Sequence, residues 1–155
     1  MHLLKRIICC FFIVVVVGVI GFIIAIPLVN NNIARKELKR LEKLPLPKNA
    51  QCIEVTSKAG KMSGNGNGMQ YVGVMLIKSD MKMDDLEKYY EDFSNEKHEI
   101  GVFSDPSKII EDWRLDLDSD VGKEGYYLVY SWTDVYSESL SGVDEFFSEW
   151  DLRGH

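Results

Sequence analysis

The side chains able to catalyse a reaction are few in this 155-residue sequence, and they are scattered. Its imidazoles are limited to His2, His98 and His155, and His2 is separated from the others by a long apolar run. No G-x-S-x-G, H-E-x-x-H or spaced Cys–His pattern is present. The sequence therefore favours a non-enzymatic protein with no catalytic, cofactor-binding or metal site. A membrane-anchored hydrolase is the alternative.

Alternating aspartates at 116, 118 and 120 resemble the start of a calcium-binding EF-hand loop. The match fails downstream, because the sixth position is Val121 instead of glycine and the twelfth is Tyr127 instead of glutamate. Weak calcium binding is the alternative to a solvated strand face. Strict alternation of apolar and polar residues in WRLDLDSD (113–120) predicts a half-buried strand.

A glycine-rich segment, SGNGNG (63–68), joins two β-prone runs at 52–58 and 69–77. Glycine and asparagine tolerate positive φ, so the pattern predicts a β-hairpin whose second strand, nearly all apolar, is buried on both faces. A phosphate-cradling loop would need a following helix, whereas a strand follows here.

The C-terminal DLRGH places Asp151, Arg153 and His155 at alternate positions. In an extended edge strand these three side chains would project to one side. Two interpretations stay open: an internal ion pair that fixes the tail, or a recognition patch for a partner.

Residues 7–29 are 23 positions without a charge or a strongly polar side chain. A helix of this length spans about 34 Å, enough to cross a bilayer core, so residues 1–29 are expected to be an N-terminal transmembrane helix. A cleaved signal peptide is disfavoured because its apolar region is shorter and ends in a small-residue cleavage site. Cys9 and Cys10 begin the run, so they do not fit a lipoprotein anchor, and S-palmitoylation is a minor alternative for them.

Residues 30–48 form a basic segment of six Lys and Arg against two Glu, and end in LPLP. Ala34, Leu38 and Leu41 share one helical face. This segment is expected to be a juxtamembrane helix and proline linker, either lying on anionic headgroups or forming a solvated stalk.

Residues 49–155 carry ten bases and 22 acids, a net charge of −12. Such an acidic domain is repelled by nucleic acid and favours a basic protein or peptide partner, besides the lipid bilayer. The bases after the apolar run favour a cytoplasmic domain, whereas the signal-anchor pattern of Lys5 and Arg6 favours an outside one. We expect the soluble domain outside the cytoplasm.

This acidic segment has the length of one domain, and its single cysteine, Cys52, precludes an internal disulfide. Apolar periodicity predicts a helix over 83–95, a strand over 98–103 and a helical turn from 105 to 111. A strand over 125–135 and a short helix from about 141 to 150 follow. The expected fold is α+β: one transmembrane helix and a small, mainly antiparallel sheet packed with one or two helices.

The segments LPLP, NGNGM, LIKSD, LEKYY and DLRGH together resemble an uncharacterised family of small bacterial single-span membrane proteins. Those relatives usually carry serine where this chain has Lys82, a difference that removes a helix cap. The resemblance implies a membrane location and a compact extracytoplasmic domain, and it implies no activity. The expected function is a membrane-anchored binding or accessory protein.

Overall fold

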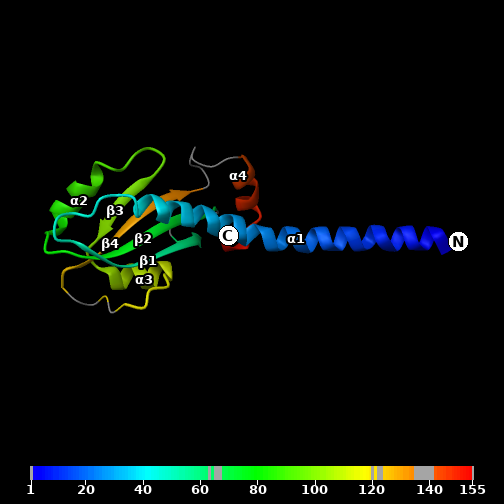
Figure 1. The fold of residues 1–155 in the computed structure, drawn as a ribbon, viewed down its shortest axis with the longest axis horizontal. Coiled ribbons are helices and arrows are strands. Elements are labelled where there is room, and N and C mark those ends of the chain that lie inside the picture. Colours follow the sequence, from blue (N-terminus) through cyan, green and yellow to red (C-terminus); the bar gives the residue numbers. More distant parts are fainter. Residues whose placement is uncertain are drawn as a thin grey trace.

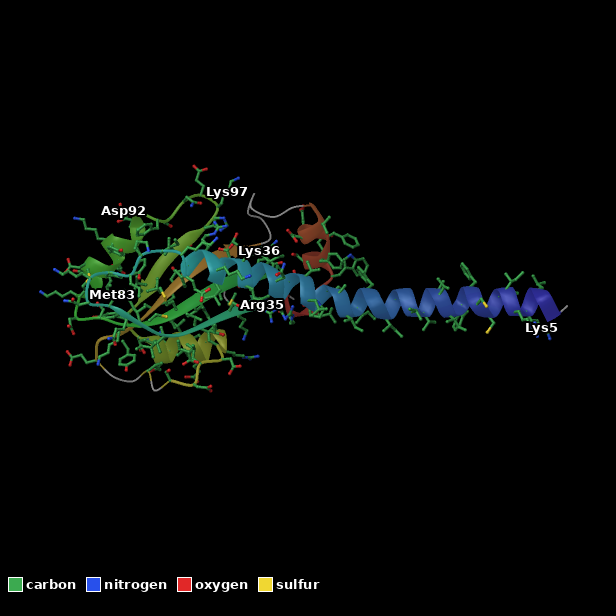
Figure 2. All side chains as sticks on the ribbon, viewed as in Figure 1. Lys5, Arg35, Lys36, Met83, Asp92 and Lys97 are labelled. Atoms are coloured by element: carbon green, nitrogen blue, oxygen red, sulfur yellow. The ribbon has the colours of Figure 1, made fainter. Side chains whose placement is uncertain are left out.

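The computed structural model describes residues 2–62, 64, 68–119, 121, 124–134 and 142–154. Its dominant element is α1 (His2–Leu41), a helix of 40 residues. The N-terminal part of α1 projects away from the rest of the chain, and the C-terminal part lies against a sheet (Figure 1). Side chains on the projecting part carry almost no nitrogen or oxygen until Lys5, at its far end (Figure 2). By length and composition, α1 is able to cross a membrane.

The sheet contains β1 (Gln51–Gly60), β2 (Gln70–Lys78), β4 (Tyr126–Asp134) and β3 (Glu99–Phe103), in that spatial order. All neighbouring pairs are antiparallel. The predicted hairpin is confirmed by the pairing of β1 with β2. The turn between them lies partly outside the described residues, at Ser63 and 65–67.

Helices cover both faces of the sheet. The face that carries Met75 and Ile77 packs against α1 and α2 (Met83–Glu91). The face that carries Val72 and Val74 packs against residues of and after α3 (Pro106–Trp113). Because successive strand residues point to opposite faces, the uninterrupted apolar run of β2 is buried on both, as predicted. The expected α+β class is confirmed.

Gly73, in the centre of β2, lets α1 approach the sheet closely. A Cβ atom there would overlap the backbone of Leu38 and lie 2.6 Å from the carbonyl carbon of Glu37. The helix backbone therefore rests directly on the strand, which only glycine permits.

The predicted juxtamembrane helix is present up to Leu41, and the predicted linker after it is not helical, but the apolar face of this helix packs on the sheet and is not covered by headgroups or solvent. The helix continues through Pro27 and Asn30 without a break, and Ala34 and Leu41 are buried against the sheet. These side chains face the sheet because their spacing of seven repeats along one face of α1. The folded unit thus includes the C-terminal half of α1.

The predicted strand WRLDLDSD is also wrong. Trp113 ends α3, Arg114 caps that helix in the left-handed conformation at φ 50°, and the chain beyond it pairs with no described strand. The helical pattern of this segment outweighed the alternation. Its apolar residues Ile109, Ile110 and Trp113 share one helical face, and the Asp105 side chain accepts from the Lys108 amide at the N-terminus of the helix. The part of the prediction that concerns burial is confirmed, since Leu115 is buried and Arg114 is exposed.

The C-terminal tail is not the expected edge strand. After α4 (Gly142–Glu149), residues Leu152–Gly154 form one 3₁₀ turn, η1. The Arg153 carbonyl accepts from the Lys61 amide at 2.8 Å, and the Gly154 carbonyl accepts from the Gly68 amide at 2.8 Å. These contacts tie the tail to the ends of β1 and β2 without a ladder. Ser141 and Val135, parts of the predicted helix cap and strand, lie outside the described residues.

Candidate functional site

A groove of about 620 Å³ lies between α1 and β1. Four of its ten lining residues are basic and one is acidic: Asn31, Arg35, Leu38, Lys39, Glu42, Thr56, Ser57, Lys58, Ala59 and Arg153. The α1 residues recur every three or four positions, which places them on the helix face beside β1. Residues 56–59 of β1 form the opposite wall.

Positive charge in this groove exceeds negative charge. Arg153 is paired with Asp151, whereas Arg35, Lys39 and Lys58 have no carboxylate partner in the part of the chain that the structure describes. Lys58 Nζ donates to the Arg114 carbonyl at 2.7 Å. Partial burial, followed by the charges of Arg114 and Arg153, lowers the pKa of Lys58. Apart from the paired Arg153, the groove therefore has three bases against one acid, Glu42, and carries a net positive charge.

The end of the groove nearest the projecting helix adjoins a buried polar network centred on Asn30. Its amide nitrogen donates to Asp151 Oδ2 at 2.8 Å and to the Phe147 carbonyl at 3.3 Å. Its amide oxygen accepts from Tyr71 at 2.8 Å and from Ser148 at 3.3 Å, and the Tyr71 and Ser148 hydroxyls also contact each other. Burial raises the pKa of Tyr71 to about 12. Every polar group of Asn30 is satisfied.

Two of the three predicted tail residues meet in this network. Arg153 donates to both carboxylate oxygens of Asp151, at 2.9 and 2.6 Å, and Nη1 donates to Asn31 at 2.8 Å. Burial alone would raise the pKa of Asp151, but hydrogen bonds from Arg153 and Asn30 hold it below its usual value. The predicted internal ion pair is present for these two residues. His155 lies outside the described residues, and a recognition role for the three stays a prediction.

A second buried cluster joins Glu37 of α1, His98 and Ser131 of β4. Ser131 Oγ donates to Glu37 Oε2 at 2.9 Å, and His98 Nδ1 lies 3.1 Å from the same oxygen. In a serine hydrolase the histidine stands between the hydroxyl and the carboxylate. Here the carboxylate stands between the other two, so His98 is not placed to take the Ser131 proton. We therefore interpret the cluster as structural, because it provides hydrogen-bond partners for the buried Glu37 carboxylate.

The aspartates at 116 and 118 lie beyond α3, and Asp120 is outside the described residues. The amides of Asp118 and Ser119 both donate to the Glu54 carboxylate at 2.9 Å, which fixes the extended segment to β1. A hydrogen bond from the Ser119 side chain, followed by the bond from the Asp118 amide, lowers the pKa of Glu54. Within the described ranges no three His, Cys, Asp or Glu side chains gather as metal ligands would. Weak calcium binding stays an untested alternative.

No family model, curated protein or solved structure matches this chain. The expected resemblance to a bacterial single-span family therefore stays a prediction.

Sequence reasoning missed the groove and both buried clusters. Asn30, Ala34, Glu37 and Leu41 follow one another at spacings of four, three and four, on one face of α1. Two polar residues within an apolar heptad stripe are the signal that could have found the clusters. The groove itself has no sequence signal, because it arises from the packing of α1 beside β1.

Proposed function

We propose that this chain is a single-pass membrane protein whose domain, outside the cytoplasm, binds a phosphate-bearing anion without catalysing a reaction. The observation that carries this proposal is the groove between α1 and β1, whose walls hold three bases without a carboxylate partner among the described residues. The membrane location rests on the exposed apolar half of α1.

The volume and charge of the groove define the class of ligand. A volume of about 620 Å³ is within the range of pockets for small molecules or headgroups. Lys and Arg bind phosphate through charge-assisted hydrogen bonds. A basic protein or peptide, which the net charge of residues 49–155 favours, would be repelled here and would have to bind elsewhere on the domain.

The position of the groove favours a ligand at the membrane surface. Asn31 and Arg153 line the end of the groove that adjoins the apolar part of α1, and Arg35 follows one turn later. A lipid phosphate or a free phosphate group near the bilayer could therefore enter without a change in the fold.

Binding can be tested with the full chain in nanodiscs. One arm adds inorganic phosphate to zwitterionic discs, and the other replaces part of the lipid with phosphatidylglycerol. Both arms measure the shift in melting temperature. A shift in the phosphate arm indicates a free anion as ligand, and a shift restricted to the second arm indicates a lipid headgroup.

A matched pair of variants separates the groove from general surface charge. Arg35→Gln with Lys39→Gln should weaken binding about a hundredfold or more, because each of the two charge-assisted bonds contributes about 1.5–3 kcal/mol. Lys36→Gln with Lys43→Gln removes the same charge from exposed positions that do not line the groove, and should change binding little. Figure 2 labels the adjacent Arg35 and Lys36 on α1. Equal effects of the two pairs would contradict a groove site.

Orientation is tested separately. A reporter active only outside the cytoplasm, fused after His155, should give activity. Activity from a cytoplasm-only reporter at the same position would place the domain inside.

A further inference from the structure

The last helix of the fold carries a cluster of exposed apolar side chains. The exposed fractions in and after α4 are 64% for Val143, 48% for Phe146, 58% for Trp150 and 85% for Leu152. Val143, Phe146, Phe147 and Trp150 are spaced by three, one and three residues, so they share one helical face. Glu145 points away from that face. A soluble domain gains nothing from exposing such a cluster, which indicates a surface that is covered in use.

This face is continuous with the apolar surface of α1. The Phe22 ring of α1 packs against the rings of Phe146, Phe147 and Trp150, with centroids 5.8, 5.7 and 6.0 Å apart. Phe22 lies inside the charge-free run, with exposed Ile23 and Ile24 beside it. Figure 1 shows α4 standing beside α1 where the helix leaves the domain. The exposed apolar surface of α4 therefore adjoins the apolar surface of α1 that is available to lipid.

We propose that α4, with Trp150 and Leu152, inserts its apolar face into the interfacial layer of the bilayer that α1 spans. This inference rests on the proposed membrane anchoring and is independent of the groove. The partner is lipid, because the face joins the lipid-facing surface of α1 without a polar boundary.

The depth of insertion is set by where α4 meets α1. From Phe22 to Val29, the end of the apolar run, α1 rises about 10 Å. Interfacial amphipathic helices bury their apolar face about 5–10 Å into the boundary between headgroups and acyl chains. Tryptophan and phenylalanine are characteristic of this layer, where an aromatic ring meets both lipid and water. The geometry of α4 therefore matches an interfacial helix.

The polar network holds α4 in place. Ser148, on the buried side of α4, contacts the Tyr71 hydroxyl and lies 2.7 Å from the Asp144 carbonyl, and the Asn30 amide donates to the Phe147 carbonyl. Because these contacts hold its buried side, α4 keeps its aromatic face at a fixed position along α1. Insertion would seat the sheet domain directly against the membrane, with the groove at the headgroup layer.

Fluorescence quenching by brominated lipid tests this proposal on the full chain. Bromines placed near the top of the acyl chains should quench a large part of the tryptophan emission of the wild type. Trp150→Phe should remove most of that quenching, since Trp113 and Trp132 belong to the core cluster on the other face of the sheet. Trp150 is exposed, so its replacement leaves the core intact.

A variant in α1 separates failure of this proposal from failure of the anchor. Phe12→Trp, added to Trp150→Phe, places an indole at an exposed position within the apolar run. Quenching of this variant without quenching of Trp150 would overturn the insertion of α4 and leave the anchor standing. Absence of quenching in both would overturn both. Unchanged quenching after Trp150→Phe would overturn the insertion. An unquenched Trp150 whose emission shifts to the red as the protein is diluted in lipid would assign the face to a second copy, which also overturns it.

Discussion

The C-terminal half of α1 meets the sheet in two regions of opposite chemistry. At the end far from the projecting helix, Leu41 packs with Met75, Leu86 and Tyr90 in an apolar cluster. At the near end, Asn30 is buried among Tyr71, Ser148 and Asp151. Apolar packing is strong and non-directional, whereas a hydrogen-bond network is satisfied in only one arrangement. Both ends supply apolar burial, since Ile33, Ala34 and Met69 form a buried cluster at the near end, but only the near end adds a polar network that fixes the register of the helix against the sheet and α4.

The far end should show the largest loss on truncation. Leu86→Ala removes a fully buried side chain and should cost about 2–5 kcal/mol of unfolding free energy. Chemical denaturation of the full chain in detergent, followed by tryptophan fluorescence, measures this loss. Ile53→Ala, at an exposed position of β1, is the control and should cost less than about 0.5 kcal/mol. An equally small cost for Leu86→Ala would remove the apolar region as the source of stability.

The contact between the backbones of α1 and β2 is tested at Gly73. A methyl group there collides with the backbone of α1, so Gly73→Ala should destabilise the fold by about 3 kcal/mol, near the upper end for overpacking. Gly142→Ala is the matched control, because outside its own helix backbone and chain neighbours no atom of the described residues lies within 4 Å of the position of its Cβ. Similar melting temperatures for the two variants would mean that α1 does not rest on β2.

Two buried tyrosines compare the regions directly. Tyr71 at the near end bonds Asn30, whereas Tyr90 at the far end has a buried hydroxyl without a described hydrogen-bond partner. Tyr71→Phe should cost about 1–2 kcal/mol, because it removes a hydrogen bond from the buried network. Tyr90→Phe should be neutral or stabilising, because it removes an unpaired polar group. Equal losses on denaturation would contradict the division into polar and apolar regions.

The smallest expected effect concerns pH. Burial lowers the pKa of His98, although Glu37 opposes the shift, and the charges of Arg40 and Lys97 add to it. The folded state then binds fewer protons than the unfolded state below the ordinary histidine pKa of about 6.5. Stability should therefore fall as pH drops from about 7 to 5, and His98→Asn should flatten that part of the melting curve against pH. A wild-type melting temperature that rises on acidification would contradict a neutral buried His98.

Local patterns were sufficient to predict most elements. The apolar run of β2, the periodicity of Leu86 and Tyr90 in α2, and the β-prone residues of β4 each matched the structure. They did so because propensity and burial pointed the same way in those segments. In residues 113–118 propensity and burial disagreed. The alternation correctly predicted which side chains are buried, but Trp113 belongs to α3 and the residues after it pair with no described strand.

Long-range packing explains what the sequence did not reveal. The basic residues of 30–48 suggested a helix on headgroups, yet Glu37 and Asn30 on its other face are buried by contact with strands far along the chain. Asp151 and Arg153 were correctly selected as a pair, but their geometry depends on Asn30, more than one hundred residues away. The central glycine of β2 was the one local indication that another backbone would approach there.

Our main conclusion is that the C-terminal half of α1 is part of the domain core. It is tested most directly by comparing the thermal unfolding of two fragments in mild detergent, residues 26–155 and residues 49–155. The first retains the sheet-packing half of α1, and the second begins after it. We expect a cooperative transition for 26–155 and none for 49–155. A cooperative transition of 49–155 at the same temperature would show that the sheet folds without α1, and would contradict the claim.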